Sequence, residues 1–330
     1  MTTLFPSDPL SPETLVDQIS FVRSQSKADM LDALMIDRLK QNTFKFSPSE
    51  MIDWGRGPTF ECFYNGHAGP REEILNRESL WNALGPQNRD NVTLDQVKQL
   101  KVHCYYDDSP DADLKWTAYE CIEVDVEVGE QFTLAGGQWS QIATNFQQTV
   151  NDYFTVLKQG APVLPAAVLR DDYNQERTHV EEGKYINRLT ANNPDTMAKV
   201  HQCGTQIYVG GNEVELCDIY DLSKDFLHLK SWRGSQGFSA LSMQASNAAE
   251  LLVSDRGFLS DSRALLTGMG NQYANVLPDQ FNPREYRIVV GLIRREAGDI
   301  PFFSRLTLMR AAERIEGKAL RAAFVSIAVQ

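Results

Sequence analysis

Hydrophobic and polar positions along the chain predict a mixture of helices and strands. Apolar side chains recur at helical spacing over 27–39 and over 144–159, where Phe146, Val150 and Leu157 belong to one stripe. Two-residue alternation and β-branched or aromatic composition predict strands elsewhere. The strands expected in the first part of the chain lie near 60–67, 101–106, 116–128 and 131–142.

The first part of the chain predicts an α+β region. Ser11 and Pro12 are typical of a helix start, and the apolar spacing from Leu15 to Val22 indicates a helix that pairs with 27–39 in a helical hairpin. We assign this hairpin and the following strands to an N-terminal accessory region, residues 1–142.

From residue 193 onward the pattern predicts the order α-β-β-β-α-β-α-β. The expected elements are a helix over 194–201, strands over 206–209, 213–218 and 226–230, a helix over 235–252, a strand over 285–293, a helix from about 304 and a closing strand over 319–329. Residues 170–188 are densely polar and predict a solvent loop or the wall of an active site. We assign residues 143–330 to one α/β domain.

Composition is that of an ordinary globular protein, with 330 residues and a net charge of −12. Residues 225–330 carry 13 Lys and Arg against 10 Asp and Glu, so the negative charge belongs to the first part. No apolar run is long enough for a membrane span, and we expect a cytoplasmic protein. Five cysteines without a C-x-x-C pair argue against a zinc knuckle and against a disulfide framework.

The candidate chemistry lies between 213 and 252. Asp218 ends one predicted strand, and His228 and Lys230 project from the same face of the next. A solvated sheet face or an edge strand explains such a pattern without function. The functional interpretation is a site that binds a divalent metal and a phosphodiester. The acid and a second metal ligand would then hold the metal, and the ammonium group would lie beside the attacking water.

This spacing and the α-β-β-β-α-β order resemble the PD-(D/E)-x-K nucleases, whose core is restriction-endonuclease-like. The resemblance implies that Asp218 and His228 bind Mg²⁺ or Mn²⁺, that Lys230 polarises the water, and that Gln244 supports it. Asp172, as a further metal ligand, or Glu176 would supply an additional acid. His228 departs from the pattern, which has Asp or Glu there, and imidazole favours Mn²⁺, Fe²⁺ or Zn²⁺ over Mg²⁺.

The loop 234–239 precedes the predicted helix and could hold a phosphate on its backbone amides. The side chains expected to assist in binding a phosphate or nucleic acid are Arg233, Ser235, Ser239, Tyr173 and Asn174. A plain helix cap of Ser and Gly is the alternative interpretation of this loop.

A second resemblance covers residues 115–330. The segments KWTAYECIEVDV, RDDYN, VELCD, LHLK, FSALSMQASNAAELL and PFFSRLTLMRAA occur in that order. They resemble a sporadically distributed bacterial family of unknown function that is linked to mobile and defence genes. This resemblance implies a role in anti-phage biology, and it implies that other members have a longer N-terminal region.

Two hypotheses follow. The first is a metal-dependent nuclease of bacterial anti-phage defence that hydrolyses phosphodiester bonds in DNA or RNA. The second is a non-catalytic sensor or adaptor of a defence or toxin–antitoxin system that binds a phage component or a partner protein from the same operon. Either form could be a homo-oligomer, and neither requires a membrane.

Overall fold

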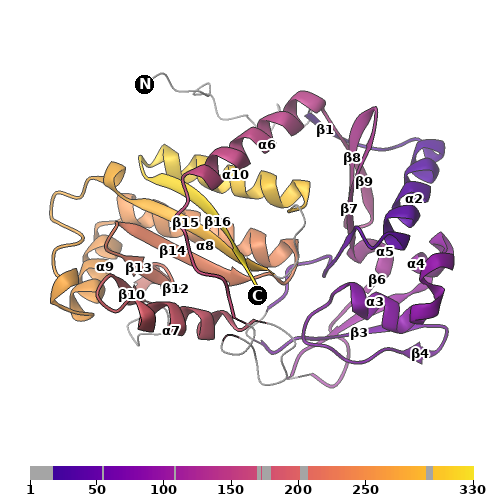
Figure 1. Ribbon diagram of the computed structural model, residues 1–330, viewed down its shortest axis with the longest axis horizontal. Coiled ribbons are helices and arrows are strands. Elements are labelled where there is room, and N and C mark those ends of the chain that lie inside the picture. Colours follow the sequence, from indigo (N-terminus) through magenta and orange to yellow (C-terminus); the bar gives the residue numbers. More distant parts are fainter. Residues whose placement is uncertain are drawn as a thin grey trace. The chain divides into compact units, whose positions relative to one another are not determined.

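The computed structural model describes most of the chain, which folds into two compact units (Figure 1). The described residues are 18–53, 56–107, 109–168, 172, 180–200, 207–294 and 300–330. The first unit consists of residues 1–149, 233–237 and 300–303, and the second of residues 150–232, 238–299 and 304–330. Each unit is considered by itself below.

The first unit contains two antiparallel sheets, with strand orders β1-β9-β8-β7-β2 and β4-β3-β5-β6. The strands are β1 (Ile19–Phe21), β2 (Lys45–Phe46), β3 (Thr59–Tyr64), β4 (His67–Ala68), β5 (Lys101–Tyr105), β6 (Leu114–Thr117), β7 (Ile122–Val128), β8 (Glu130–Ala135) and β9 (Gln138–Ile142). The helices are α2 (Gln25–Lys40), α3 (Arg77–Leu84), α4 (Leu94–Gln99) and the short α5 (Ala118–Cys121). Asn76, Thr93 and Thr117 start α3, α4 and α5 with capping boxes.

A buried carboxylate ties α2 to the rest of the first unit. Asp32, which is 3% exposed, accepts hydrogen bonds from the Tyr119 hydroxyl at 2.6 Å and from the Trp139 indole at 2.9 Å. The Lys98 ammonium lies 3.1 Å from its other oxygen. A buried acid with this many donors is a structural junction, because each donor offsets part of its desolvation.

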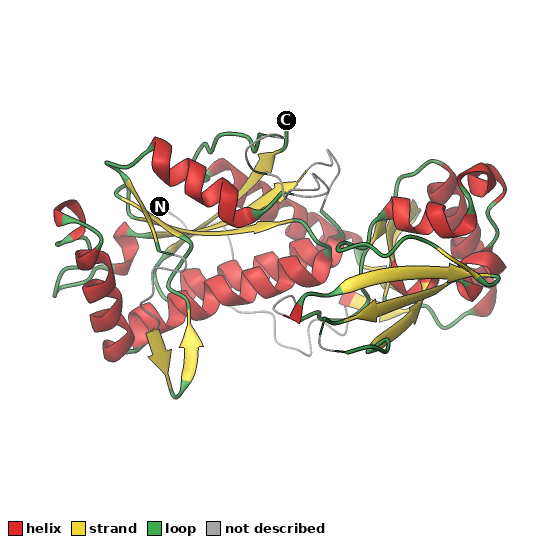
Figure 2. Cartoon of the chain, turned by 90° about the horizontal axis from the view of Figure 1, so that it is seen from below, coloured by secondary structure: helices red, strands yellow, loops and turns green. Residues whose placement is uncertain are grey.

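The second unit is built on one mixed sheet in the order β10-β13-β14-β15-β16. The strands are β10 (Met197–Lys199), β13 (Ile219–Asp221), β14 (Asp225–Ser231), β15 (Arg287–Arg294) and β16 (Arg321–Ala328). β13 is antiparallel to β10 and β14, whereas β14, β15 and β16 are mutually parallel. A separate hairpin of β11 (Ile207–Val209) and β12 (Asn212–Val214) stands apart from this sheet (Figure 2).

In the described part of the chain, two helices lie between β9 and β10, two between β14 and β15, and one between β15 and β16. They are α6 (Thr144–Gln159), α7 (Glu182–Asn192), α8 (Ser235–Ser254), α9 (Arg256–Gly268) and α10 (Phe302–Gly317). On one face, Leu227 and Leu229 of β14 share a core cluster with Tyr185 and Leu189 of α7. Long crossovers through helices are what parallel neighbours such as β14 and β15 require.

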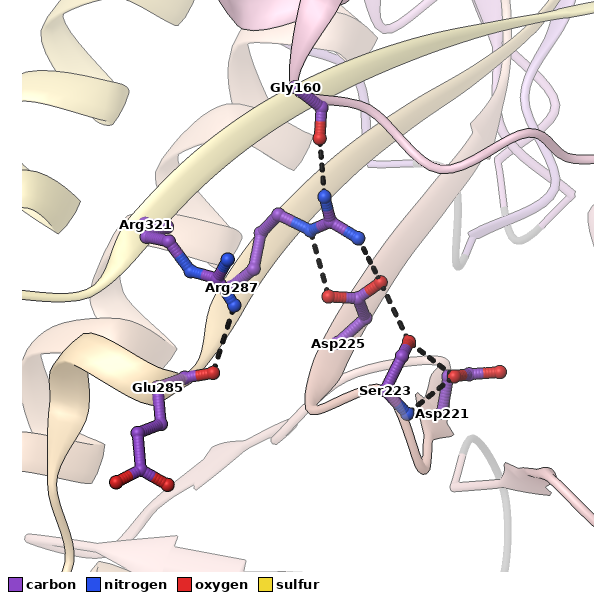
Figure 3. Close-up of polar contacts among 7 residues, drawn as sticks. All are labelled: Gly160, Asp221, Ser223, Asp225, Glu285, Arg287 and Arg321. Atoms are coloured by element: carbon purple, nitrogen blue, oxygen red, sulfur yellow. Dashed lines mark hydrogen bonds and ion pairs between the residues drawn. The ribbon is translucent and has the colours of Figure 1, made fainter.

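Polar contacts join the starting ends of the parallel strands (Figure 3). Asp225 of β14 is 1% exposed, and its carboxylate accepts two hydrogen bonds from the Arg287 guanidinium of β15, one of them 2.8 Å long. Arg287 also donates to the Gly160 carbonyl, and Ser223 donates to Asp225 and Asp221. The bidentate pair therefore links β14 to β15 where their parallel pairing begins.

The expected α/β class is confirmed, and so are the helices over 144–159 and 27–39, apart from small differences at their ends. Several local predictions were wrong. Residues 19–21 form strand β1 rather than helix, and 197–199 form strand β10 within the expected helix 194–201. Residues 118–121 form α5 within the expected strand 116–128, and residues 215–218 lie outside any strand although a strand was expected over 213–218. The expected helix start at Ser11 lies outside the described residues.

Four cysteines, Cys62, Cys104, Cys121 and Cys217, are buried and form no disulfide; Cys203 lies outside the described residues. Burial raises the pKa of the Cys62 thiol to about 12 and that of Cys104 to about 11. These thiols are therefore neutral core side chains.

Candidate functional site

Among the described residues, no strand pairs with the second half of β14 on its β13 side. β13 pairs only with residues 225–227, and β14 continues to Ser231. The backbone N–H groups of Leu229 and Ser231 point towards that side, because alternate N–H groups of a strand point to the same edge. Buried N–H groups need acceptors, so this edge must be satisfied by something other than a strand.

Asp218 supplies the first acceptor. Its Oδ2 accepts a hydrogen bond of 2.6 Å from the Leu229 N–H, and its side chain is nearly buried. The backbone of Asp218 donates to the Leu227 carbonyl and accepts from Val200 N, each at 2.9 Å. Asp218 is thus held firmly at the edge of β14, bonded to Leu229, the residue that precedes Lys230.

Glu182, the first residue of α7, supplies the second acceptor. Its Oε2 accepts from the Ser231 N–H at 3.1 Å, and its Oε1 lies 3.1 Å from the Lys230 Nζ. The Ser231 hydroxyl donates to the Val180 carbonyl at 2.6 Å, which fixes the start of α7 beside the end of β14. Both Lys230 and Glu182 retain about a quarter of their side-chain exposure, at 27% and 26%, so solvent reaches this pair.

His228 lies in a different environment from Lys230. Its side chain is fully buried, and neither ring nitrogen has a hydrogen-bond partner among the described residues. Burial lowers the pKa of His228 to about 4, although the Glu215 carboxylate opposes the shift. Glu215 in turn accepts a hydrogen bond from the Gln244 amide of α8. The imidazole is therefore neutral near pH 7 and does not reach solvent.

The Asp172 carboxylate forms an ion pair with Arg188. It is fully buried and accepts from the Arg188 guanidinium at 2.8 and 2.6 Å and from Val168 N at 2.7 Å. The Asp172 carbonyl accepts from Glu181 N at 2.8 Å. These bonds tie the segment before α7 to the helix itself, and a carboxylate so engaged is a poor choice as a metal ligand.

The expected phosphate-binding side chains divide between the units. Arg233 and Ser235 belong to the first unit, where the Ser235 hydroxyl donates to Glu123, while Ser239 is a half-buried residue of α8 in the second unit. Ser47 donates to the other Glu123 oxygen at 3.2 Å, and burial raises the pKa of this carboxyl. A carboxylate beside Ser235 disfavours a phosphate there. Tyr173, Asn174 and Glu176 lie outside the described residues.

A divalent metal can be tested against these groups. In the described part of the chain, no three His, Cys, Asp or Glu side chains come together as a ligand group. Asp218 and Glu182 bind N–H groups two residues apart, which along a strand is roughly 7 Å. Mg²⁺ keeps several waters and needs only one or two carboxylates, so a hydrated ion suits this pair, whereas a preformed zinc site does not.

Sequence reasoning did not find Glu182. It placed the additional acid at Asp172 or Glu176, because 170–188 is polar throughout and offers several acids without a distinguishing pattern. The sequence signal that could have found Glu182 is its position in the first turn of an amphipathic helix. A negative charge there interacts favourably with the helix dipole.

None of the described helices combines the length and apolar character that crossing a bilayer requires. The sequence matches no curated protein, and it matches no solved structure. A family model does match, over residues 8–328, which is nearly the whole chain. The chain therefore belongs to the family of unknown function DUF6119.

Proposed function

We propose that the second unit is a nuclease-like domain that hydrolyses phosphodiester bonds in DNA or RNA. The observation that carries the proposal is the convergence of Asp218, Glu182 and Lys230 on the unpaired edge of one strand. When the β11–β12 hairpin and α9 are left out, the order α7-β10-β13-β14-α8-β15 supports it, since this is the α-β-β-β-α-β order of restriction-endonuclease-like cores. The mixed directions of the strands agree with the same interpretation.

The roles follow from charge and exposure. Lys230 is the cation of the group, and its ammonium would leave Glu182 to bind the scissile phosphate or the attacking water. Asp218 and Glu182, with the Leu229 carbonyl, would hold a hydrated Mg²⁺ or Mn²⁺. Such an ion supplies Lewis-acid stabilisation of the phosphate and lowers the pKa of a bound water. Gln244 would act at a distance, through Glu215.

His228 has no role as a ligand in this proposal. A fully buried neutral imidazole cannot contact a substrate. Asp218 and Glu182 supply the carboxylates for the metal, so His228 is not needed as a ligand. The place of the protein in anti-phage defence, with a partner from the same operon, rests on the resemblance of residues 115–330 to a defence-linked family. It is part of the proposal on that ground alone.

A cleavage assay tests the proposal. Wild-type protein should nick labelled single-stranded or duplex substrates in Mn²⁺ or Mg²⁺ and should fail to do so with EDTA. Asp218→Asn keeps an oxygen for the Leu229 N–H, and Lys230→Met keeps the aliphatic stem, so both should fold. Each should lose at least about 100-fold in rate, the usual effect of removing an electrostatic group from a catalytic centre. Cleavage by Lys230→Met at the wild-type rate would remove the proposed centre.

The non-catalytic sensor or adaptor remains the second candidate. It is favoured by the hydrogen bonds themselves, because Asp218 and Glu182 each satisfy a backbone N–H that the strand edge would otherwise leave unpaired. Thermal unfolding with added Mn²⁺ separates the two functions. A nuclease should show a rise in melting temperature that Asp218→Asn abolishes, whereas a sensor should show no rise that depends on Asp218.

A further inference from the structure

The described helices α3 and α4 of the first unit pack on one face of its β4-β3-β5-β6 sheet. In the β4-β3-β5-β6 sheet, Phe60 and Cys62 of β3 and Val102 and Cys104 of β5 point into the core, together with Trp116 of β6. That core also contains Leu80 and Trp81 of α3 and Val97 of α4. The alternate residues of the same strands must therefore point to the opposite side.

Aromatic rings occupy the centre of this opposite face. Phe63 and His103 lie with ring centroids 4.7 Å apart, and His103 and Tyr105 lie 6.2 Å apart. The Arg71 guanidinium lies over the Tyr105 ring, 3.9 Å from its centroid. All three rings are partly exposed, and Arg71 is exposed. Rings without a covering layer are unusual on a sheet face that faces solvent, where polar residues prevail.

Cations flank these rings. Lys101 is the cross-strand partner of Phe63, and Lys115 is the cross-strand partner of His103. Both lysines are exposed. Burial lowers the pKa of His103. The positive charges of Lys115 and Lys101 lower it further, because both lysines lie close to the imidazole. Glu61, the carboxylate that acts on His103 and Tyr105 among the described residues, is paired with Arg71 at 3.3 Å. The face is therefore locally cationic although the whole chain is acidic.

We propose that this face, made by Arg71, Phe63, His103, Tyr105, Lys101 and Lys115, binds a single strand of nucleic acid. Bases would stack on Phe63 and His103, and phosphates would lie beside Lys101 and Lys115. Open sheets that present rings and cations together are suited to unstacked bases, since every base has a face that can stack. A duplex keeps its bases stacked inside and cannot use the rings.

The proposal goes beyond phosphodiester hydrolysis, because every residue of the face belongs to the first unit. It can be tested without cleavage. In EDTA, where the proposed metal-dependent activity is absent, fluorescence anisotropy of a labelled oligothymidylate of about 12 nucleotides should report binding. An oligouridylate of the same length should bind alike, because the rings and lysines contact bases and phosphates rather than the sugar.

Matched variants identify the surface. Phe63→Leu keeps an apolar side chain but removes the ring, and it should weaken binding roughly tenfold, as loss of one stacked base does. Phe21→Ala removes an exposed ring, 66% accessible, from β1 of the same unit and should bind like wild type. Replacing Lys101 and Lys115 together by Ala should reduce the slope of log K against log salt by about 1.4, since each phosphate contact on a single strand contributes about 0.7.

Three results with oligonucleotides, and one with a peptide, would overturn the proposal. The first three are the absence of oligonucleotide binding, equal affinities for wild type and Phe63→Leu, and equal affinities for a duplex and a single strand. Capture of a labelled acidic peptide in place of the oligonucleotide would also overturn it, since the lysines would then serve a protein partner. A catalytically inactive protein that binds through this face would leave the proposal intact and refute only the nuclease function.

Discussion

Replacing His228 by Leu gives a quantitative test of how the sheet of the second unit is packed. The imidazole is fully buried, with no hydrogen-bond partner among the described residues, and its pKa is lowered from 6.5 to about 4. The folded protein therefore keeps His228 neutral, whereas the unfolded chain takes up a proton as the pH falls below the ordinary value. The folded state loses stability between about pH 6.5 and pH 4, and the loss is complete below the lower value.

The size of the effect follows from the shift. A lowering of this size corresponds to about 3 kcal/mol when the pH is below both pKa values, and to about 2 kcal/mol at roughly pH 5. At neutral pH, His228→Leu should leave the sheet as stable as wild type, or about 1 kcal/mol more stable, because an unpaired buried polar group is removed. At roughly pH 5 the stability difference between the variant and wild type should be about 2 kcal/mol larger, in favour of the variant, than at neutral pH.

Hydrogen exchange of the β14 amides measures this directly, because it reports the free energy of opening for that strand rather than for the whole chain. His67→Leu is the control, since His67 is exposed on β4 in the first unit. The reasoning is refuted if His228→Leu lowers the free energy of opening at neutral pH and keeps the wild-type pH dependence. That outcome would mean that the ring makes a polar contact worth more than its burial costs.

Two further substitutions test the packing of the same sheet by chemical denaturation. Arg287→Met leaves the Asp225 carboxylate buried without its bidentate partner and should destabilise the fold by about 3–5 kcal/mol, whereas Lys224→Met removes an exposed ion pair and a contact with the Tyr286 ring and should have a much smaller effect. Gly291→Ala places a Cβ 2.3 Å from the Leu229 Cδ2 and should cost about 1–3 kcal/mol, part of which Leu229→Val should restore; no recovery in the double variant would exclude this clash as the cause.

Long periodic segments were predictable from the sequence, and short segments fixed by distant partners were not. The stripe over 144–159 specifies a helix by itself. β10 is only three residues long, and it forms because Met197, Ala198 and Lys199 pair with β13. Residues 19–21 likewise become a strand through pairing with β9, more than a hundred residues later. Local spacing contains no information about such partners.

The candidate site shows the same division. That Asp218 lies beside β14 was predictable, because a short turn joins β13 to β14, although Asp218 lies just before β13 and not within a strand. Glu182 was not predictable, because its place depends on how α7 meets the unpaired end of β14. The burial of His228 was also missed, since alternation gives its face but not what covers that face.

Glu182→Gln offers the most direct test of the central claim, that Glu182, Asp218 and Lys230 form one hydrolytic centre. The amide oxygen can still accept from the Ser231 N–H, and loss of the partly exposed pair with Lys230 should cost less than about 1 kcal/mol, so the fold should persist. We predict that the rate of metal-dependent cleavage of a labelled oligonucleotide falls at least about 100-fold. Cleavage by a stable Glu182→Gln protein at the wild-type rate would contradict the claim.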